Sequence, residues 1–133
     1  NECNVLARSR WFASAPVPAS DQPDFVNGVI SVYTALKPSA LLNNLHRIEE
    51  RFDRVRSAPN AARTLDLDLL TYHDIIKKGP EAPLLPHPRM VDRAFVLLPL
   101  ADVAADWKHP VLGDTLPSLI DALSIDQICT PIE

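Results

Sequence analysis

The stretch Arg63-Thr64-Leu65-Asp66-Leu67-Asp68-Leu69-Leu70 alternates leucine with aspartate from Leu65 to Leu69. Side chains of a β-strand alternate between its two faces, so the pattern predicts a strand with buried leucines and both aspartates on the other face. Asp is disfavoured in strands, and two like charges on one strand face repel each other. A divalent cation such as Mg²⁺, which binds carboxylate oxygens and is often completed by substrate phosphates, would compensate for this cost. The alternative is a solvated strand face with two ordinary surface carboxylates.

The composition is that of one globular domain, with 133 residues of which 47% are hydrophobic and 23% are charged. A net charge of −4 argues against a nucleic-acid-binding protein. No apolar run is long enough to cross a bilayer and no signal-peptide pattern is present, so the sequence predicts a cytoplasmic protein without a membrane partner. Cys3 and Cys129 match no metal-binding spacing and are predicted to be reduced thiols.

Arginines gather just ahead of the aspartate-bearing stretch. In an acidic chain, such a local basic cluster indicates binding of a small polyanion such as a nucleotide. Neither common glycine-rich phosphate loop is present, so side chains and metal would hold the nucleotide. The cluster consists of Arg47, Arg51, Arg54, Arg56 and Arg63.

The chain is predicted to contain both strands and helices, in a mixed order. Strands are predicted at residues 4–13, 25–35 and 64–71, with a proline-rich loop at 14–24. A helix is predicted over residues 39–55, where apolar residues recur at helical spacing. Further helices are predicted at 91–101, interrupted by Pro99, and at 116–123, followed by a loose tail. Such an order indicates an α/β or α+β sandwich.

Three motifs occur in sequence order: DQPDFVN at 21–27, RTLDLDLL at 63–70, and LPHPRM at 85–90 followed by RAF at 93–95. Together they resemble the 6-hydroxymethyl-7,8-dihydropterin pyrophosphokinase family, which transfers a diphosphate from ATP to a pterin hydroxymethyl group. The similarity runs from about Val5 to about Leu123. It implies one α+β domain over 1–133, a ferredoxin-like sandwich with a mostly antiparallel sheet and helices packed on its faces.

The resemblance also implies roles for individual residues. Asp66 and Asp68 would hold two Mg²⁺ ions that bridge the phosphates of the co-substrate ATP and the pterin hydroxyl. Phe25 and Phe95 would stack on the two faces of the pterin ring, and Asn27 would hydrogen-bond to its edge; both phenylalanines could equally be ordinary core residues. The loop that lines the pterin pocket through its backbone would be Ser14, Ala15 and Val17. Residues matching positions that bind ATP or act on its phosphates are Glu49, Arg54, Arg56, Arg63, His87 and Arg93, of which Arg54, Arg63, His87 and Arg93 would be catalytic.

The implied activity is that of a Mg²⁺-dependent 2-amino-4-hydroxy-6-hydroxymethyldihydropteridine diphosphokinase acting as a monomer on small-molecule substrates. Family members begin with a strand carrying a motif like Ala-Leu-Gly-Ser-Asn-Leu and a helix, neither of which is present here. We therefore expect the functional polypeptide to begin roughly 30 residues upstream. One alternative is a non-catalytic remnant that keeps the pterin pocket, and another is a structural module whose aspartates are surface charges only.

Overall fold

The computed structural model describes residues 3–15, 24–53 and 65–132. Contacts divide the chain into two compact units, one made of Asn1–Thr34 with Pro88–Glu133 and the other of Ala35–His87. Antiparallel strands, with helix α2 (Ala94–Val103) packed on them, and two further helices make the fold α+β, as predicted, and consistent with the ferredoxin-like class. The expected single domain over 1–133 stays a prediction.

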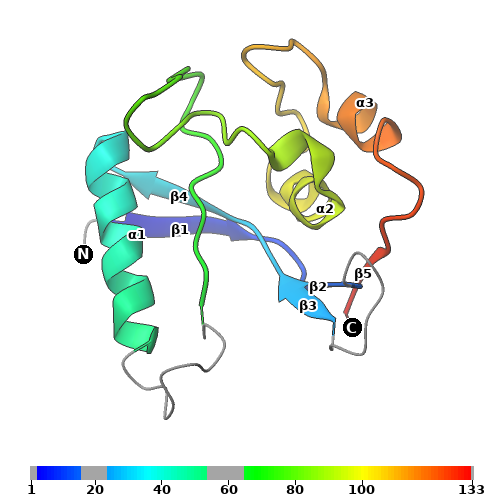
Figure 1. Cartoon of the computed structure of the whole chain (residues 1–133), viewed down its shortest axis with the longest axis horizontal. Coiled ribbons are helices and arrows are strands. Elements are labelled where there is room, and N and C mark those ends of the chain that lie inside the picture. The colour runs from blue at the N-terminus through cyan, green and yellow to red at the C-terminus, as the bar shows by residue number, and fades with distance from the viewer. Residues whose placement is uncertain (1–2, 16–23, 54–64, 133) are drawn as a thin grey trace. The chain divides into compact units, whose positions relative to one another are not determined.

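The first unit contains two antiparallel sheets (Figure 1). Strands β1 (Cys3–Arg8) and β4 (Ile30–Thr34) form a two-stranded sheet. Strand β2 (Phe12–Ser14) lies at the centre of a three-stranded sheet, between β3 (Phe25–Asn27) and β5 (Cys129–Pro131). The chain passes from β1 into β2 and returns from β3 into β4, so the two sheets are successive parts of one long hairpin.

A kink in this hairpin splits each of the two strands predicted at 4–13 and 25–35. At the kink, the N–H of Ser9 donates to the carbonyl of Val29, and the N–H of Val29 donates to the Ser9 hydroxyl, both at 2.8 Å. A Cβ on Gly28 would lie 3.2 Å from the Ser9 hydroxyl and from the Trp11 ring. The side-chain hydrogen bond interrupts the regular ladder, and glycine provides the room that the interruption requires.

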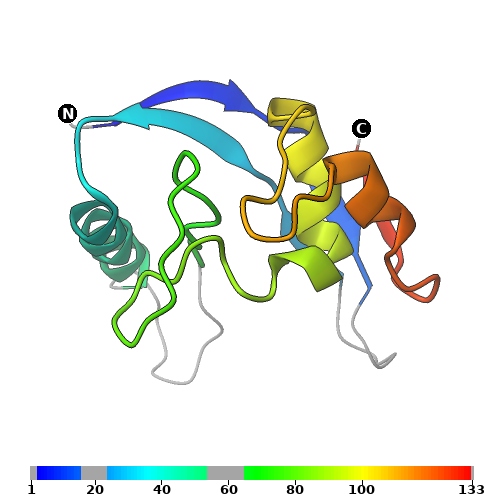
Figure 2. The same ribbon diagram turned by 90° about the horizontal axis from the view of Figure 1, so that it is seen from above.

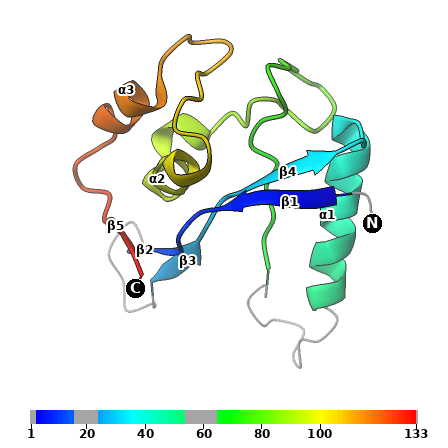
Figure 3. The same cartoon turned by 180° about the vertical axis from the view of Figure 1, so that it is seen from behind.

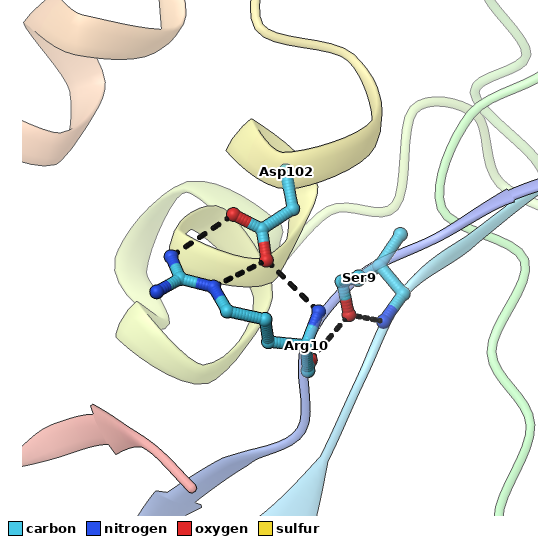
Figure 4. Close-up of polar contacts among 4 residues, drawn as sticks. Ser9, Arg10 and Asp102 are labelled. Atoms are coloured by element: carbon cyan, nitrogen blue, oxygen red, sulfur yellow. Dashed lines mark hydrogen bonds and ion pairs between the residues drawn. The ribbon is translucent and has the colours of Figure 1, made fainter. Parts of the chain in front are cut away.

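An ion pair ties this kink to helix α2 (Ala94–Val103), which carries Asp102 (Figure 4). The guanidinium of Arg10 donates to both carboxylate oxygens of Asp102, at 3.0 and 3.1 Å, and its backbone N–H donates at 2.9 Å. These hydrogen bonds lower the pKa of Asp102. The Arg10 side chain is 62% exposed, so this ion pair contributes little to the free energy of unfolding. Its main effect is to fix the position of the backbone at the kink.

Helix α2 (Ala94–Val103) forms the core of the first unit. It follows a 3₁₀ turn, η1 (Met90–Asp92), and contacts all five strands and helix α3 (Leu116–Asp121). Figures 2 and 3 show α3 lying beside it. Its Leu97 and Leu100 are buried. The predicted interruption at Pro99 was wrong, because the helix continues through this residue. The fully buried Pro99 ring supplies packing that offsets the one backbone hydrogen bond it cannot make.

The tail beyond Ser124 was predicted to be loose, and this was also wrong. Strand β5 pairs residue by residue with β2, from Phe12 opposite Pro131 to Ser14 opposite Cys129. A three-residue strand that contains a proline carries little local β signal, so its position depends on the edge that β2 offers. The Cys129 thiol is free, as predicted, and burial raises its pKa.

The second unit contains helix α1 (Pro38–Asp53) and an irregular segment running back along it (Figure 1). The helix begins at Pro38, whose fixed φ suits a first turn, and buries Leu41. It confirms the predicted helix as far as Asp53, and residues 54–55 lie outside the described part. The strand predicted at 64–71 was wrong, because the described residues 65–72 carry no strand ladder.

Candidate active site

Leucine and aspartate alternate in exposure along the segment at 65–69. Leu65, Leu67 and Leu69 are half-buried, whereas Asp66 and Asp68 are both exposed. The predicted alternation is therefore confirmed, although side-chain and loop contacts replace the strand ladder. The N–H of Leu67 donates to a Glu49 carboxylate oxygen at 2.7 Å, and the carbonyl of Leu70 accepts from the N–H of His87 at 2.7 Å.

This pair of carboxylates has the donor chemistry of a magnesium site. Both side chains offer hard oxygen ligands, are exposed to solvent, and are separated by one residue, the half-buried Leu67. Within the described residues, no group of three or more His, Cys, Asp or Glu side chains could hold a metal. Two protein carboxylates completed by water and phosphate oxygens is the arrangement that Mg²⁺ commonly adopts at nucleotides.

The second unit also carries two of the residues predicted to bind ATP. Glu49 lies on α1 and is 6% exposed, while its neighbour Glu50 is exposed to solvent. His87 is half-buried and is held by its backbone hydrogen bond to Leu70. The second unit therefore brings a buried carboxylate and an anchored histidine to the segment that bears Asp66 and Asp68.

The residues predicted to bind the pterin that can be described all belong to the first unit. Ser14 is buried at the end of β2, and the N–H of Ala15 donates to the carbonyl of Ile128 at 3.1 Å. Phe25 and Asn27 lie on β3, where Phe25 pairs with Ser14 and remains 54% exposed. An exposed phenylalanine on a strand is not a core residue, so the core alternative for Phe25 is wrong. Phe95 lies on α2 and is half-buried.

Arg93 is the N-cap residue of α2, two positions before Phe95. Its guanidinium carbon lies 5.3 Å from the centroid of the Phe95 ring, within the range of a cation–π contact. Gln127 holds the backbone on both sides of Arg93: its side-chain oxygen accepts from the N–H of Ala94, and its nitrogen donates to the carbonyl of Asp92, both at 2.8 Å. No sequence signal points to Gln127, because it lies in a tail without a local pattern.

The remaining predicted site residues cannot be placed. Val17, Arg54, Arg56 and Arg63 lie outside the described residues. Their assignments rest on the family resemblance alone and stay predictions.

Comparison with known proteins identifies the family. The model of the 7,8-dihydro-6-hydroxymethylpterin-pyrophosphokinase family matches residues 1–105. The chain belongs to this family. The predicted resemblance is therefore confirmed, and the DLD motif at 66–68 lies inside the part of the chain that matches the pyrophosphokinase family model.

Individual relatives match nearly the whole chain, and two of the three described here are named as the pyrophosphokinase. The chain is 42% identical over 127 residues to the 2-amino-4-hydroxy-6-hydroxymethyldihydropteridine pyrophosphokinase of Pseudomonas aeruginosa, covering 96% of the chain and 77% of the relative. The pyrophosphokinase of Synechocystis sp. is 40% identical over 131 residues, covering 98% of the chain and 61% of that protein. Folic acid synthesis protein fol1 of Pneumocystis carinii is 38% identical over 128 residues, covering 96% of the chain and 17% of the much longer relative.

The chain thus spans less than two thirds of the Synechocystis relative and about a sixth of the Pneumocystis one. Family membership follows from these matches, whereas the activity of the whole protein is a proposal. No helix in the described residues is both long and apolar enough to cross a membrane.

Proposed function

We propose that the full protein transfers a diphosphate group from ATP to the hydroxymethyl group of 6-hydroxymethyl-7,8-dihydropterin, with Mg²⁺. The observation that carries this proposal is the pair of exposed carboxylates, Asp66 and Asp68, on a segment whose leucines are turned away from solvent. Membership in the pyrophosphokinase family and the names of its relatives support the substrates.

In this reaction the hydroxymethyl oxygen bonds to the β-phosphorus of ATP, and the bond from that phosphorus to the oxygen of the α-phosphate breaks. AMP leaves, and the proton of the hydroxyl group is released. Asp66 and Asp68 would hold the magnesium ions, which neutralise phosphate oxygens when bound. Little covalent chemistry is required of the protein, so its contribution is positioning and charge stabilisation.

Cationic side chains from several segments supply this stabilisation in the proposal. Arginine suits phosphate because its planar fork matches two oxygens at once. Arg93 and His87 would contact the ATP phosphates, together with Arg54, Arg56 and Arg63 from the motif-based assignment.

Aromatic stacking would hold the other substrate. Phe25 and Phe95 would take the two faces of the pterin, which is a flat heterocycle suited to contact with aromatic rings. Asn27 would hydrogen-bond to the ring edge, and Ser14, Ala15 and Val17 would bind the ring through backbone groups. The exposure of Phe25, at 54%, leaves its ring available for such a contact. We also propose that the protein acts in the cytoplasm as a monomer.

Titration with ATP, with and without Mg²⁺, followed by titration with the dihydropterin, tests this function in the full protein. The proposal requires that ATP bind in a Mg²⁺-dependent manner and that the pterin also bind. Pterin binding without metal-dependent ATP binding would contradict it and indicate a non-catalytic remnant. Binding of neither ligand would contradict it as well and indicate a structural module.

A further inference from the structure

Glu49 is a buried carboxylate with a backbone partner. It lies on α1 with 6% of its surface exposed, and it accepts a hydrogen bond from the N–H of Leu67 at 2.7 Å. That length falls in the range of charge-assisted hydrogen bonds. Removing a carboxylate from water is costly unless it is hydrogen-bonded, so a buried glutamate whose helical neighbour Glu50 remains in water requires a specific reason.

The partner of Glu49 suggests that reason. Leu67 lies between Asp66 and Asp68, and its N–H belongs to the peptide that follows Asp66. Because the described residues 65–72 form no strand ladder, the direction of this segment depends on individual contacts. The contact from Glu49 acts at the centre of the aspartate pair, whereas the contact from His87 acts two residues beyond it, at Leu70.

We propose that Glu49 is a positioning residue for the metal-binding pair, fixing the peptide between Asp66 and Asp68 so that both carboxylates are available to bind divalent cations. This inference rests on the proposed function. It differs from the direct ATP contact that the sequence motif implies for Glu49, because a carboxylate with 6% exposure has little surface left for a nucleotide. Residues that orient metal ligands commonly affect metal affinity by about 10–100-fold.

The test uses Mn²⁺ as the probe, with free Mn²⁺ measured by electron paramagnetic resonance in the full protein, and hydrogen exchange of the Leu67 amide as a second readout. Glu49→Ala should weaken Mn²⁺ binding about 10-fold or more and accelerate exchange at Leu67. Glu49→Gln keeps an acceptor at the same reach, so it should remain close to the wild-type protein on both readouts. Glu50→Ala removes the exposed neighbouring carboxylate on the same helix and should change neither.

If Glu49→Ala does not fold, Glu49→Asp serves instead, because it withdraws the acceptor from Leu67 while keeping the charge. It should likewise weaken Mn²⁺ binding. Wild-type Mn²⁺ affinity in the alanine or aspartate variant would overturn the inference, as would a Glu49→Gln variant that loses ATP affinity with normal Mn²⁺ binding. Asp66→Asn distinguishes the proposed metal site from the proposed role of Glu49. If this variant retains Mn²⁺ binding, the metal site is wrong. If it loses Mn²⁺ binding while the Glu49 variants keep it, only the role of Glu49 is wrong.

Discussion

The side-chain oxygen of Gln127 accepts a hydrogen bond from the backbone N–H of Ala94 at 2.8 Å, joining the segment before β5 to the first residue of α2. The first N–H groups of a helix have no partner within it, and Gln127 satisfies one of them. The same side chain donates to the carbonyl of Asp92. It therefore fixes the backbone on both sides of Arg93, next to the Phe95 ring that we propose to contact the pterin.

Replacing Gln127 with alanine should loosen the start of α2. Two hydrogen bonds are lost, each contributing about 0.5–1.5 kcal/mol, so the free energy of unfolding in urea should fall by about 1–3 kcal/mol. Dihydropterin affinity should fall as well, because Arg93 and Phe95 lose their fixed backbone. Ile125→Ala is the control, since this fully exposed residue lies two positions away. Unchanged stability and pterin affinity in Gln127→Ala would contradict the assigned contacts.

His109 organises the loop between α2 and α3. Its ring nitrogen Nδ1 accepts from the N–H of Val111 at 3.2 Å and from that of Leu112 at 3.1 Å. A nitrogen that accepts hydrogen bonds cannot carry a proton, so the ring is neutral with its hydrogen on Nε2. Burial lowers the pKa of His109 from its ordinary value of 6.5, against the opposing effect of the Asp114 carboxylate.

Stability should consequently depend on pH through His109. Below about pH 6.5 the unfolded chain protonates this histidine before the folded chain does, so stability is complete above that pH and declines as the pH falls towards the lower folded pKa. His109→Asn, whose side-chain oxygen replaces Nδ1 as the acceptor, should flatten this part of the profile. Melting temperatures between pH 5 and pH 8 measure the effect.

His46→Asn provides the matched control, because His46 is exposed on α1. It should leave the pH profile of the wild-type protein unchanged. A His109→Asn profile as steep as that of the wild-type protein would show that His109 is not the responsible group.

The two phenylalanines of the proposed pterin site should affect one substrate and not the other. Phe25→Ala and Phe95→Ala should each weaken dihydropterin binding by roughly 1 kcal/mol or more, from lost aromatic and apolar contact. ATP affinity should change much less. Calorimetric titration with each ligand measures both. Tyr33→Ala removes another exposed aromatic side chain, from β4, and should affect neither ligand.

Equal losses for pterin and ATP in either phenylalanine variant would contradict the stacking assignment. A fall in melting temperature with normal pterin affinity would indicate instead that Phe95, the half-buried member, belongs to the core.

Local patterns predicted the features that depend on neighbours in sequence. The helical spacing that begins after Pro38 gives α1, and the alternation at 65–69 gives exposed Asp66 and half-buried Leu67. The strand predicted at 64–71 was wrong for the described residues, because alternation indicates which side chains are buried but not whether a partner strand is present. The burial of the Pro99 ring likewise depends on packing that no local rule includes.

Long-range contacts carried no signal in the sequence. Strand β5 pairs with β2 more than a hundred residues away, and Arg10 meets Asp102 at a separation of 92 residues. Glu49 matches a nucleotide-site position of the family, but its hydrogen bond to Leu67 is visible only in the structure. The family resemblance therefore identified the candidate metal-binding and substrate-binding residues, whereas the residues that position them were found only in the structure.

The central claim is that Asp66 and Asp68 support Mg²⁺-dependent transfer of diphosphate to the pterin. The most direct measurement incubates the full protein with the dihydropterin and with ATP labelled at the β-phosphate, and quantifies the AMP and the labelled pterin diphosphate that form. We predict equal amounts of both products, no reaction after chelation of Mg²⁺, and a loss of about 100-fold or more in Asp66→Asn or Asp68→Asn, the scale of removing one preorganised electrostatic contact. Formation of ADP in place of AMP, or near-normal turnover in both variants at saturating Mg²⁺, would contradict the account.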